Sequence, residues 1–450
     1  MHILDVFSGT KTGGDHTPTG ASEMQGIRHL PPGHQTPVNS SRFNKPRRPF
    51  GDPTAALKGT PRFIPPPFTN LQNLVLPLEI VLRDPGEEKR IEGAGRLVFH
   101  CVGDTGGIHG TQAQEAIAHA MEAQIQSAAP ADRPAFFYHL GDVVYFNGLR
   151  DLYGVQFYEP YKYYPAPIFA IPGNHDGDTQ TRPGDTPDHE PSLSGFIDNF
   201  CDSQSKHLDT YRETMTQPYV YWVLEAPFAT VIGLYSNVDG SLDGRGTNEQ
   251  QRWFEGQMRS APAGKCLIVA VHHPPYSLDS DHGGSPAILA ALERASGLGG
   301  RWPDAVFSGH VHNYYQRFTR TVNGRQIPLV VAGAGGYAND RKSMHQLQLD
   351  ASGHPVPAGA PFQTTAEGVV LESYEETNPG FLRLTVDADT LTGEYFTVPF
   401  DDAPPAHPAD TFRLNWKTHR LGGGPAGASA AGPKADPGSA GHRHPKPRRQ

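Results

Sequence analysis

The chain has 450 residues, more than one hydrophobic core normally spans, so it holds either two domains or one domain with long terminal segments. Its 43 prolines and 50 glycines concentrate at the two ends, which favours one central domain between segments that bury little apolar surface. A net charge of -9 excludes a broad basic surface, so nucleic acid is not expected as a bulk partner.

The two ends of the chain lack the apolar runs of its centre. Residues 1–69 are rich in Pro, Gly, Ser and His, which predicts an N-terminal arm that is in part extended or disordered. Residues 401–450 are predicted to form a C-terminal extension that ends in a disordered basic tail. Residues 70–400 carry nearly all the apolar runs and are predicted to form the folded domain.

The sequence also bears on location and redox state. No stretch approaches the roughly 20 apolar residues of a membrane span. The start, Met1 to Asp5, is acidic where a secretory signal would be basic and then apolar, so we expect a cytoplasmic protein. The three cysteines are an odd set, far apart, which predicts buried free thiols at Cys101, Cys201 and Cys266.

Short apolar runs that end in Gly, Asp, Asn or His recur along the central region. Such runs predict strands covered on both faces, whose polar ends gather along one sheet edge, where open α/β sheets bind ligands. The first apolar stretch, 71–82, is expected to form one strand or a pair. The runs with polar ends are Leu97–Val102, Ala135–Leu140, Pro167–Ile171, Leu267–Val271 and Ala305–Phe307.

Helix start signals lie between several of these runs and favour an α/β fold. Two of them are capping-box patterns and the third is a serine before a proline. They are Thr111 with Gln114, Thr247 with Gln250, and Ser285 with Pro286.

The later part of the chain predicts further strands. Asn323-Gly324 between two apolar stretches indicates a two-residue hairpin, and 381–386 with 394–398 indicates another pair. We therefore expect two mixed sheets that form a β-sandwich, with helices on the outer faces. The segments 178–191 and 342–367 are predicted to be a surface loop and a long loop.

The polar side chains at the strand ends are nitrogen and oxygen donors without thiolate, which suits iron, zinc or manganese. A helical turn after Asp142 is expected to bring Tyr145 to the same side. Seven donors are too many for one ion, but they suit two ions that share Asp142. Two ions about 3.5–4 Å apart suit phosphoester hydrolysis, because they clamp both oxygens of an in-line displacement and acidify a water. The donors are Asp104, Asp142, Tyr145, Asn174, His272, His310 and His312, with His175 nearby.

Taken in order, these motifs resemble those of the calcineurin-like metallophosphoesterases over about residues 95 to 335. The first motif of that superfamily is usually Asp-x-His, but Asp104-Thr105-Gly106 lacks the histidine. The purple acid phosphatase branch lacks it too, and supplies a tyrosine from the second motif, as Gly141–Tyr145 does here. The remaining motifs are Gly173–Asp176, Val269–His272 and Gly309–His312.

By position, the resemblance implies two metal ions bridged by Asp142. The first, Fe(III) in that branch, would be held by Asp104, Tyr145 and His312. The second, Fe(II), Zn or Mn, would be held by Asn174, His272 and His310. His175 would stand beside the phosphate, and His282 lies about where that branch has a further substrate-facing histidine. Either histidine could serve as the general acid that the leaving alkoxide needs.

The predicted activity is hydrolysis of phosphomonoesters, with a small phosphorylated substrate as partner. One alternative is a phosphodiesterase or nucleotide-directed phosphohydrolase on the same site. Another is a non-catalytic metal-binding protein that uses its basic tail for contacts. His175 favours an enzyme, because it is not needed to hold metal. The purple acid phosphatase branch is commonly exported, in contrast to the cytoplasmic location expected here, and the oligomeric state stays open.

Overall fold

The computed structural model describes residues 74–82, 85–107, 110–178, 190, 192–201, 205–207, 212–242, 248–279, 282–312, 315–337, 359–399 and 407–422. The predicted N-terminal arm, the basic tail and most of the two loops predicted at 178–191 and 342–367 lie outside the described residues.

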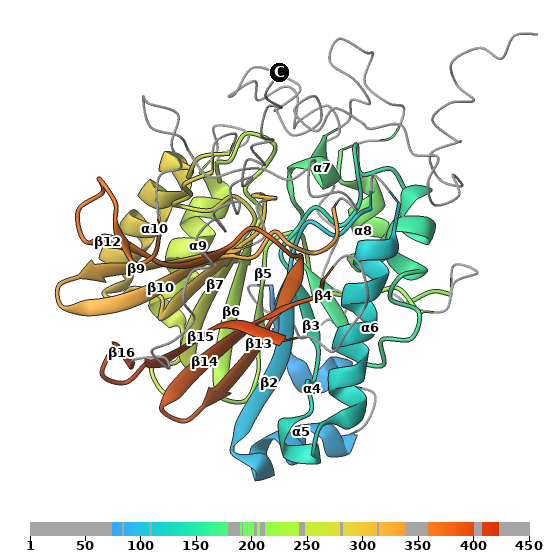
Figure 1. Ribbon diagram of the computed structural model, residues 1–450, viewed down its shortest axis with the longest axis horizontal. Helices are drawn as coiled ribbons and strands as arrows, with labels where there is room; N and C mark the ends of the chain where they lie inside the picture. Colours follow the sequence, from blue (N-terminus) through green and yellow to red (C-terminus); the bar gives the residue numbers. More distant parts are fainter. Residues whose placement is uncertain are drawn as a thin grey trace, which may run out of the picture.

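Two mixed sheets pack against each other and carry helices on their outer faces, which confirms the predicted two-sheet α/β fold (Figure 1). Within the described residues, the first sheet has the order β1-β5-β6-β7-β8-β10-β9-β12-β11. Its strands are β1 (Val75–Pro77), β5 (Trp222–Glu225), β6 (Ala229–Leu234), β7 (Cys266–Val271), β8 (Ala305–Ser308), β9 (Tyr315–Val322), β10 (Arg325–Val331), β11 (Phe362–Gln363) and β12 (Val369–Glu375).

The second sheet has the order β16-β15-β14-β13-β2-β3-β4. Its strands are β2 (Arg96–Val102), β3 (Phe137–His139), β4 (Ile168–Ala170), β13 (Gly380–Asp387), β14 (Thr390–Thr397), β15 (His407–Asn415) and β16 (Arg420–Gly422). The core lies between the two sheets, where Trp222 of β5 packs on Tyr138 and Phe169 of β3 and β4. The indole Nε1 also donates to the Ala170 carbonyl at 3.2 Å, which ties the sheets together.

The five apolar runs with polar ends are all strands, as predicted. They are β2, β3, β4, β7 and β8, and their side chains are almost entirely buried. Within each sheet, the neighbouring strands of this group are parallel: β2 with β3 and β3 with β4 in the second sheet, and β7 with β8 in the first. Parallel strands end at the same sheet edge, so the polar residues that follow them meet there.

Helices cover the outer faces of both sheets (Figure 1). The amphipathic helix α6 buries Ile117 and Met121, whereas α9 and α10 pack against each other and join the core of the first sheet. The helices are α4 (Leu78–Val81), α5 (Pro85–Ala94), α6 (Gln112–Ser127), α7 (Asn174–Gly177), α8 (Ser194–Phe200), α9 (Glu249–Ser260) and α10 (Pro286–Gly299). Two short helical turns, η2 (Pro130–Asp132) and the π-helical η3 (Gly154–Tyr158), lie between them. Within the described residues, no helix is long and apolar enough to cross a membrane.

The predicted helix starts are confirmed as helices but differ in their caps. Ser285 caps α10, because its hydroxyl accepts the Ile288 amide at 3.2 Å. Thr111 precedes α6 but makes no cap bond and instead donates to Glu115 at 2.7 Å. Helix α9 begins after Asn248, and the Thr247 of the predicted box lies outside the described residues.

The first apolar stretch differs from the expected strand or pair of strands. Val75–Pro77 forms β1, and the next four residues turn into α4 and bury Leu78. Pro77 has no amide hydrogen with which to continue the ladder, so the strand ends there. The two predicted hairpins, β9 with β10 and β13 with β14, are confirmed.

The second sheet continues beyond the predicted domain boundary at residue 400. Residues 407–422, assigned above to the C-terminal extension, form β15 and β16 and pair onto β14. Asp410 of β15 accepts hydrogen bonds from Arg317 Nε at 2.6 Å and from the Tyr315 hydroxyl at 2.8 Å, both on β9 of the other sheet. We therefore propose that the folded domain extends to Gly422.

The three cysteines Cys101, Cys201 and Cys266 are buried and none forms a disulfide with a described residue, as predicted. Burial raises the pKa of the Cys266 thiol well above its ordinary value. Burial raises the pKa of the Cys101 thiol as well, so these two thiols are kept protonated and serve as small apolar side chains of the core.

Candidate metal centre

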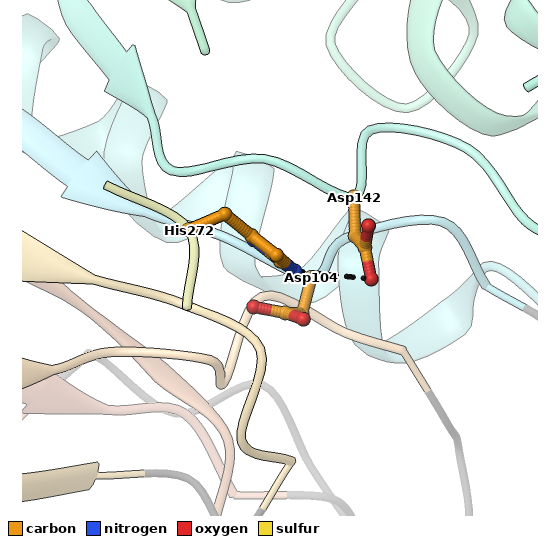
Figure 2. Close-up of side chains that lie close together, drawn as sticks. All are labelled: Asp104, Asp142 and His272. Atoms are coloured by element: carbon orange, nitrogen blue, oxygen red, sulfur yellow. Dashed lines mark ion pairs between the residues drawn. The ribbon is translucent and has the colours of Figure 1, made fainter. Parts of the chain in front are cut away.

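Two carboxylates and one imidazole converge at the shared edge of the parallel strands. Asp104 follows β2, Asp142 follows β3 and His272 directly follows β7. One donor atom from each lies within 4.8 Å of the other two, and all three side chains are buried (Figure 2). The three come from segments far apart in sequence, so the strand order is what brings them together.

The backbone of this edge is held in unusual conformations. Asp104, Asp142 and His310 have φ of 60°, 52° and 71°, in the left-handed region that non-glycine residues seldom adopt. Gly141 and Gly309 are required for close approach, because a Cβ at Gly141 would lie 2.7 Å from His272 Nδ1 and one at Gly309 2.5 Å from Asp104 Oδ2. Strain of this kind is typical of sites whose geometry is imposed by function.

Asp104 contacts the other two side chains assigned above to the first metal, Tyr145 and His312. Its Oδ1 accepts a hydrogen bond from the Tyr145 hydroxyl at 3.2 Å and lies 3.1 Å from His312 Nε2. The Tyr145 hydroxyl also lies 3.2 Å from His312 Nε2, so the three donors form a triangle. The other oxygen, Oδ2, accepts the backbone amide of His310 at 2.8 Å.

The route by which Tyr145 reaches this triangle differs from the expected helical turn. Residues 141–147 contain no helix, and Asp142 itself is left-handed. Asp176 accepts the backbone amides of Val143 at 3.1 Å and Val144 at 3.3 Å, so the loop cannot use those amides for helical bonds. A contact from 33 residues away therefore shapes the loop.

Asn174 contacts the other two side chains assigned to the second metal, His272 and His310. Its Oδ1 lies 3.1 Å from His272 Nε2 and 3.0 Å from His310 Nδ1. His272 Nδ1 donates to the Leu140 carbonyl at 2.8 Å, which fixes the ring and directs Nε2 into the site. Asn174 stands at the start of α7, immediately after β4, as the prediction of a strand-end residue requires.

Asp142 lies between the two groups. Its Oδ1 accepts the His175 amide at 2.9 Å, and its Oδ2 lies 3.4 Å from His272 Nε2. Oδ2 is buried yet receives no hydrogen bond from the part of the chain that the structure describes. A buried carboxylate oxygen without a donor is costly unless a cation compensates it. The donor set, in which six side chains form two groups beside Asp142, fits two metal ions that share this carboxylate.

The ionisable groups perturb one another strongly. Burial, together with the negative charge of Asp142, raises the pKa of Asp104 to about 8. Burial opposes ionisation of Asp142 as well, but the positive charge of His272 outweighs it and holds that pKa below its usual value. Burial would lower the pKa of His272, but the two carboxylates raise it to about 9. Such mutual perturbation is typical of functional sites.

The two further predicted histidines, His175 and His282, pack against different donors of the centre. His175 Nδ1 donates to the Phe146 carbonyl at 2.8 Å, and its ring lies 4.7 Å from that of Tyr145. His282 lies against His310 with 4.5 Å between ring centres, and its amide donates to Asp279 at 2.6 Å.

His273, the neighbour that was not selected as a ligand, makes a hydrogen bond of 2.7 Å between its Nδ1 and the Ser236 hydroxyl, and its ring packs at a tilt against that of His310. Its ring centre lies 4.1 Å from that of His310. The His272 ring directs Nε2 to Asp142 at 3.4 Å and to Asn174 at 3.1 Å, so the choice of His272 over His273 stays the prediction.

Three side chains that were not among the predicted site residues support the centre. Asp176 accepts amides from the Asp142 loop and from Gly173, and Tyr337 stacks on His312 at 3.8 Å. The buried His139 joins Thr105 and Gly141. For His139, the signal in the sequence was a histidine inside an otherwise apolar run, because a polar group buried there needs hydrogen-bond partners.

Two mixed sheets flanked by helices, with carboxylates and imidazoles at the strand ends, define a metallophosphoesterase fold. More specifically, residues 97–314 match the model of the calcineurin-like phosphoesterase family.

A curated relative and two solved structures are similar to this chain. The probable glycerophosphodiester phosphodiesterase GpdQ of Arcobacter nitrofigilis is 25% identical over 220 residues, 48% of this chain and 66% of the relative. Purple acid phosphatase PPD1 from yellow lupin (Lupinus luteus) seeds has a TM-score of 0.48 at 18% identity, covering 71% of this chain and 54% of the lupin chain. GAP50, the anchor in the inner membrane complex of Plasmodium, has a TM-score of 0.46 at 13% identity, covering 71% and 89%. This chain thus spans just under two thirds of the curated relative and about half of the lupin protein.

Proposed function

We propose that this protein is a phosphoester hydrolase that acts on phosphomonoesters at a centre of two metal ions. The observation that carries the proposal is the position of the Asp142 carboxylate between two groups of nitrogen and oxygen donors. Its buried Oδ2 accepts no hydrogen bond from the described residues and lies 3.4 Å from His272 Nε2. One group would hold the first ion with Asp104, Tyr145 and His312. The other would hold the second ion with Asn174, His272 and His310.

When bound, the two ions would polarise the phosphoryl group and lower the pKa of an attacking water. The residues of the chain supply orientation and proton transfer. His175 Nδ1 donates to the Phe146 carbonyl and so keeps its proton, which leaves Nε2 as the ring nitrogen that can gain or lose a proton. Nε2 can then hold a proton for the leaving alkoxide, and His282, which packs against His310, is the second candidate for this role.

The identity of the metals is part of the proposal. We assign Fe(III) to the group with Tyr145 and Fe(II), Zn or Mn to the group with Asn174. Support comes from the Tyr145 hydroxyl, which is buried and lies 3.2 Å from both Asp104 and His312, where a phenolate ligand would be needed. Burial and the two carboxylates hold the pKa of the Tyr145 phenol well above its ordinary value. Bound Fe(III) would oppose this effect and favour the phenolate.

The visible spectrum tests this assignment. Protein that has been loaded with iron is expected to show a phenolate-to-iron charge-transfer band, and Tyr145→Phe is expected to remove it while metal analysis still finds two ions. A colourless protein with two zinc or manganese ions would contradict the iron assignment and would leave the phosphoesterase proposal intact.

Turnover of matched aryl substrates tests the reaction. A simple aryl phosphomonoester is expected to have the higher kcat/KM, and the diester with the same leaving group the lower. Similarity to the probable glycerophosphodiester phosphodiesterase of Arcobacter nitrofigilis favours diester hydrolysis as the second candidate. A higher kcat/KM for the diester would select that candidate, and an Asn174→Ala variant that keeps full turnover would contradict a metal-dependent reaction.

A further inference from the structure

His139 is the last residue of β3 and contacts the loops of the candidate metal centre without belonging to its donor set. Its side chain is fully buried. The Nδ1 atom lies 3.1 Å from the backbone nitrogen of Gly141, and Nε2 lies 2.9 Å from the Thr105 hydroxyl. Both ring nitrogens are therefore used, one on each of two neighbouring loops.

The directions of these two hydrogen bonds are fixed by chemistry. A backbone amide can only donate, so Nδ1 accepts the Gly141 N–H, and the ring proton resides on Nε2. Nε2 then donates to the Thr105 hydroxyl. Burial lowers the pKa of His139 to about 3, so the ring stays neutral and keeps this one tautomer.

The two loops that His139 joins carry the two carboxylates of the centre. Thr105 follows Asp104, and Gly141 precedes Asp142. The loops are also joined by the Asp104 amide, which donates to the Gly141 carbonyl at 2.9 Å, and by the Thr105 amide, which donates to the Asp142 carbonyl at 3.2 Å. Both aspartates are left-handed, so the loops need such links to hold them.

We propose that His139 is a positioning residue that sets the spacing between the Asp104 and Asp142 carboxylates, and so the separation of the two metal ions. The inference rests on the proposed function only in requiring two ions that share Asp142. His139 acts through Thr105 and Gly141, and it touches neither ion. Removal of its hydrogen bonds is expected to loosen the metal pair more than the fold.

The two hydrogen bonds can be removed separately. In His139→Asn the amide oxygen takes the place of Nδ1, so the acceptor for Gly141 is kept and the bond to Thr105 is lost. In His139→Gln the amide nitrogen takes the place of Nε2, so the donor to Thr105 is kept. His139→Phe removes both bonds and keeps a ring, and Thr105→Val removes only the hydroxyl.

His100 provides a matched control. It lies on the neighbouring strand β2, is also fully buried, and bonds through both nitrogens, to the Tyr164 hydroxyl at 3.0 Å and to Gln124 at 3.2 Å. Burial lowers its pKa to about 3, as for His139. His100→Phe therefore imposes a similar structural cost without touching a loop that carries a donor.

The experiment measures Mn²⁺ binding to metal-free full-length protein by titration calorimetry, with the EPR spectrum of the loaded protein as the readout of metal separation. Wild type is expected to bind two Mn²⁺ as a spin-coupled pair. His139→Phe is expected to weaken binding of one ion about tenfold or more, as loss of an outer hydrogen bond does at other metal sites, and to replace the coupled signal by that of isolated ions. His139→Asn and Thr105→Val are expected to give the same change in smaller measure.

Three outcomes would overturn the proposal. The first is a coupled pair and unchanged affinity in all the His139 variants, whatever their melting temperatures in the metal-free state. The second is an equal loss of the coupled signal in His100→Phe. The third is a His139→Phe/Thr105→Val double variant that binds Mn²⁺ much more weakly than His139→Phe. If Thr105 acts through its hydrogen bond to His139, its loss should add little once His139 is gone. Wild type that binds no pair of Mn²⁺ would instead contradict the proposed function itself, so the two failures are distinguishable.

Discussion

His175 is the residue that separates metal binding from catalysis. Its backbone amide bonds Asp142, but its ring bonds the Phe146 carbonyl and packs on Tyr145. His175→Ala therefore keeps the contact to the bridging carboxylate and is expected to retain both metal ions. It should lower turnover of an unactivated alkyl phosphate by about 10² to 10⁴, the usual contribution of a general acid.

A comparison of leaving groups identifies the role of this ring. An aryl ester with an acidic phenol needs little protonation as it departs, so His175→Ala should affect it much less than the alkyl ester. His282→Ala serves as the parallel variant, and the exposed His119→Ala serves as the control. An equal loss for both leaving groups would show that His175 orients the substrate instead of donating a proton.

At the scale of helices, the contrast between α10 and α6 gives a stability prediction. The Ser285 hydroxyl satisfies the Ile288 amide, so Ser285→Ala is expected to cost about 1 kcal/mol of unfolding free energy. Thr111→Ala before α6 should cost clearly less, because Thr111 makes no cap bond and its hydroxyl donates to the Glu115 side chain instead. Thermal unfolding of the two variants measures the difference, and equal costs would contradict the assigned cap.

The same elements show how far the sequence predicts this structure. Strands β2, β3, β4, β7 and β8 were predictable because buried parallel strands need continuous apolar runs, and the gathering of polar residues at their ends follows from their shared direction. The path of the loop from Asp142 to Tyr145 was not, because Asp176, distant in sequence, takes its amides. Local pattern also could not reveal that Gln114 bonds the Gln156 carbonyl instead of completing a cap.

At the scale of the whole molecule, residues far from the centre complete the layers that support it. Strand β13 joins β14 to β2, the strand that carries Asp104 at its end. The C-terminal strand β15 extends this sheet, and Asp410 links it to β9 of the other sheet through Arg317 and Tyr315. The centre therefore sits at the edge of two sheets that the C-terminal strands help to hold together.

Two truncations test the proposed boundary of the domain at Gly422. Removal of residues 407–450 would delete three buried side chains, Phe412, Leu414 and Trp416, each worth about 1.5–3 kcal/mol of burial, and would expose the edge of β14. Because native domains are stable by only about 5–15 kcal/mol, we expect this variant to unfold or aggregate. Removal of residues 423–450 keeps β15 and β16 and should leave the melting temperature and the binding of two metal ions unchanged. A stable protein after the longer deletion, judged by cooperative thermal unfolding and metal stoichiometry, would return the boundary to about residue 400.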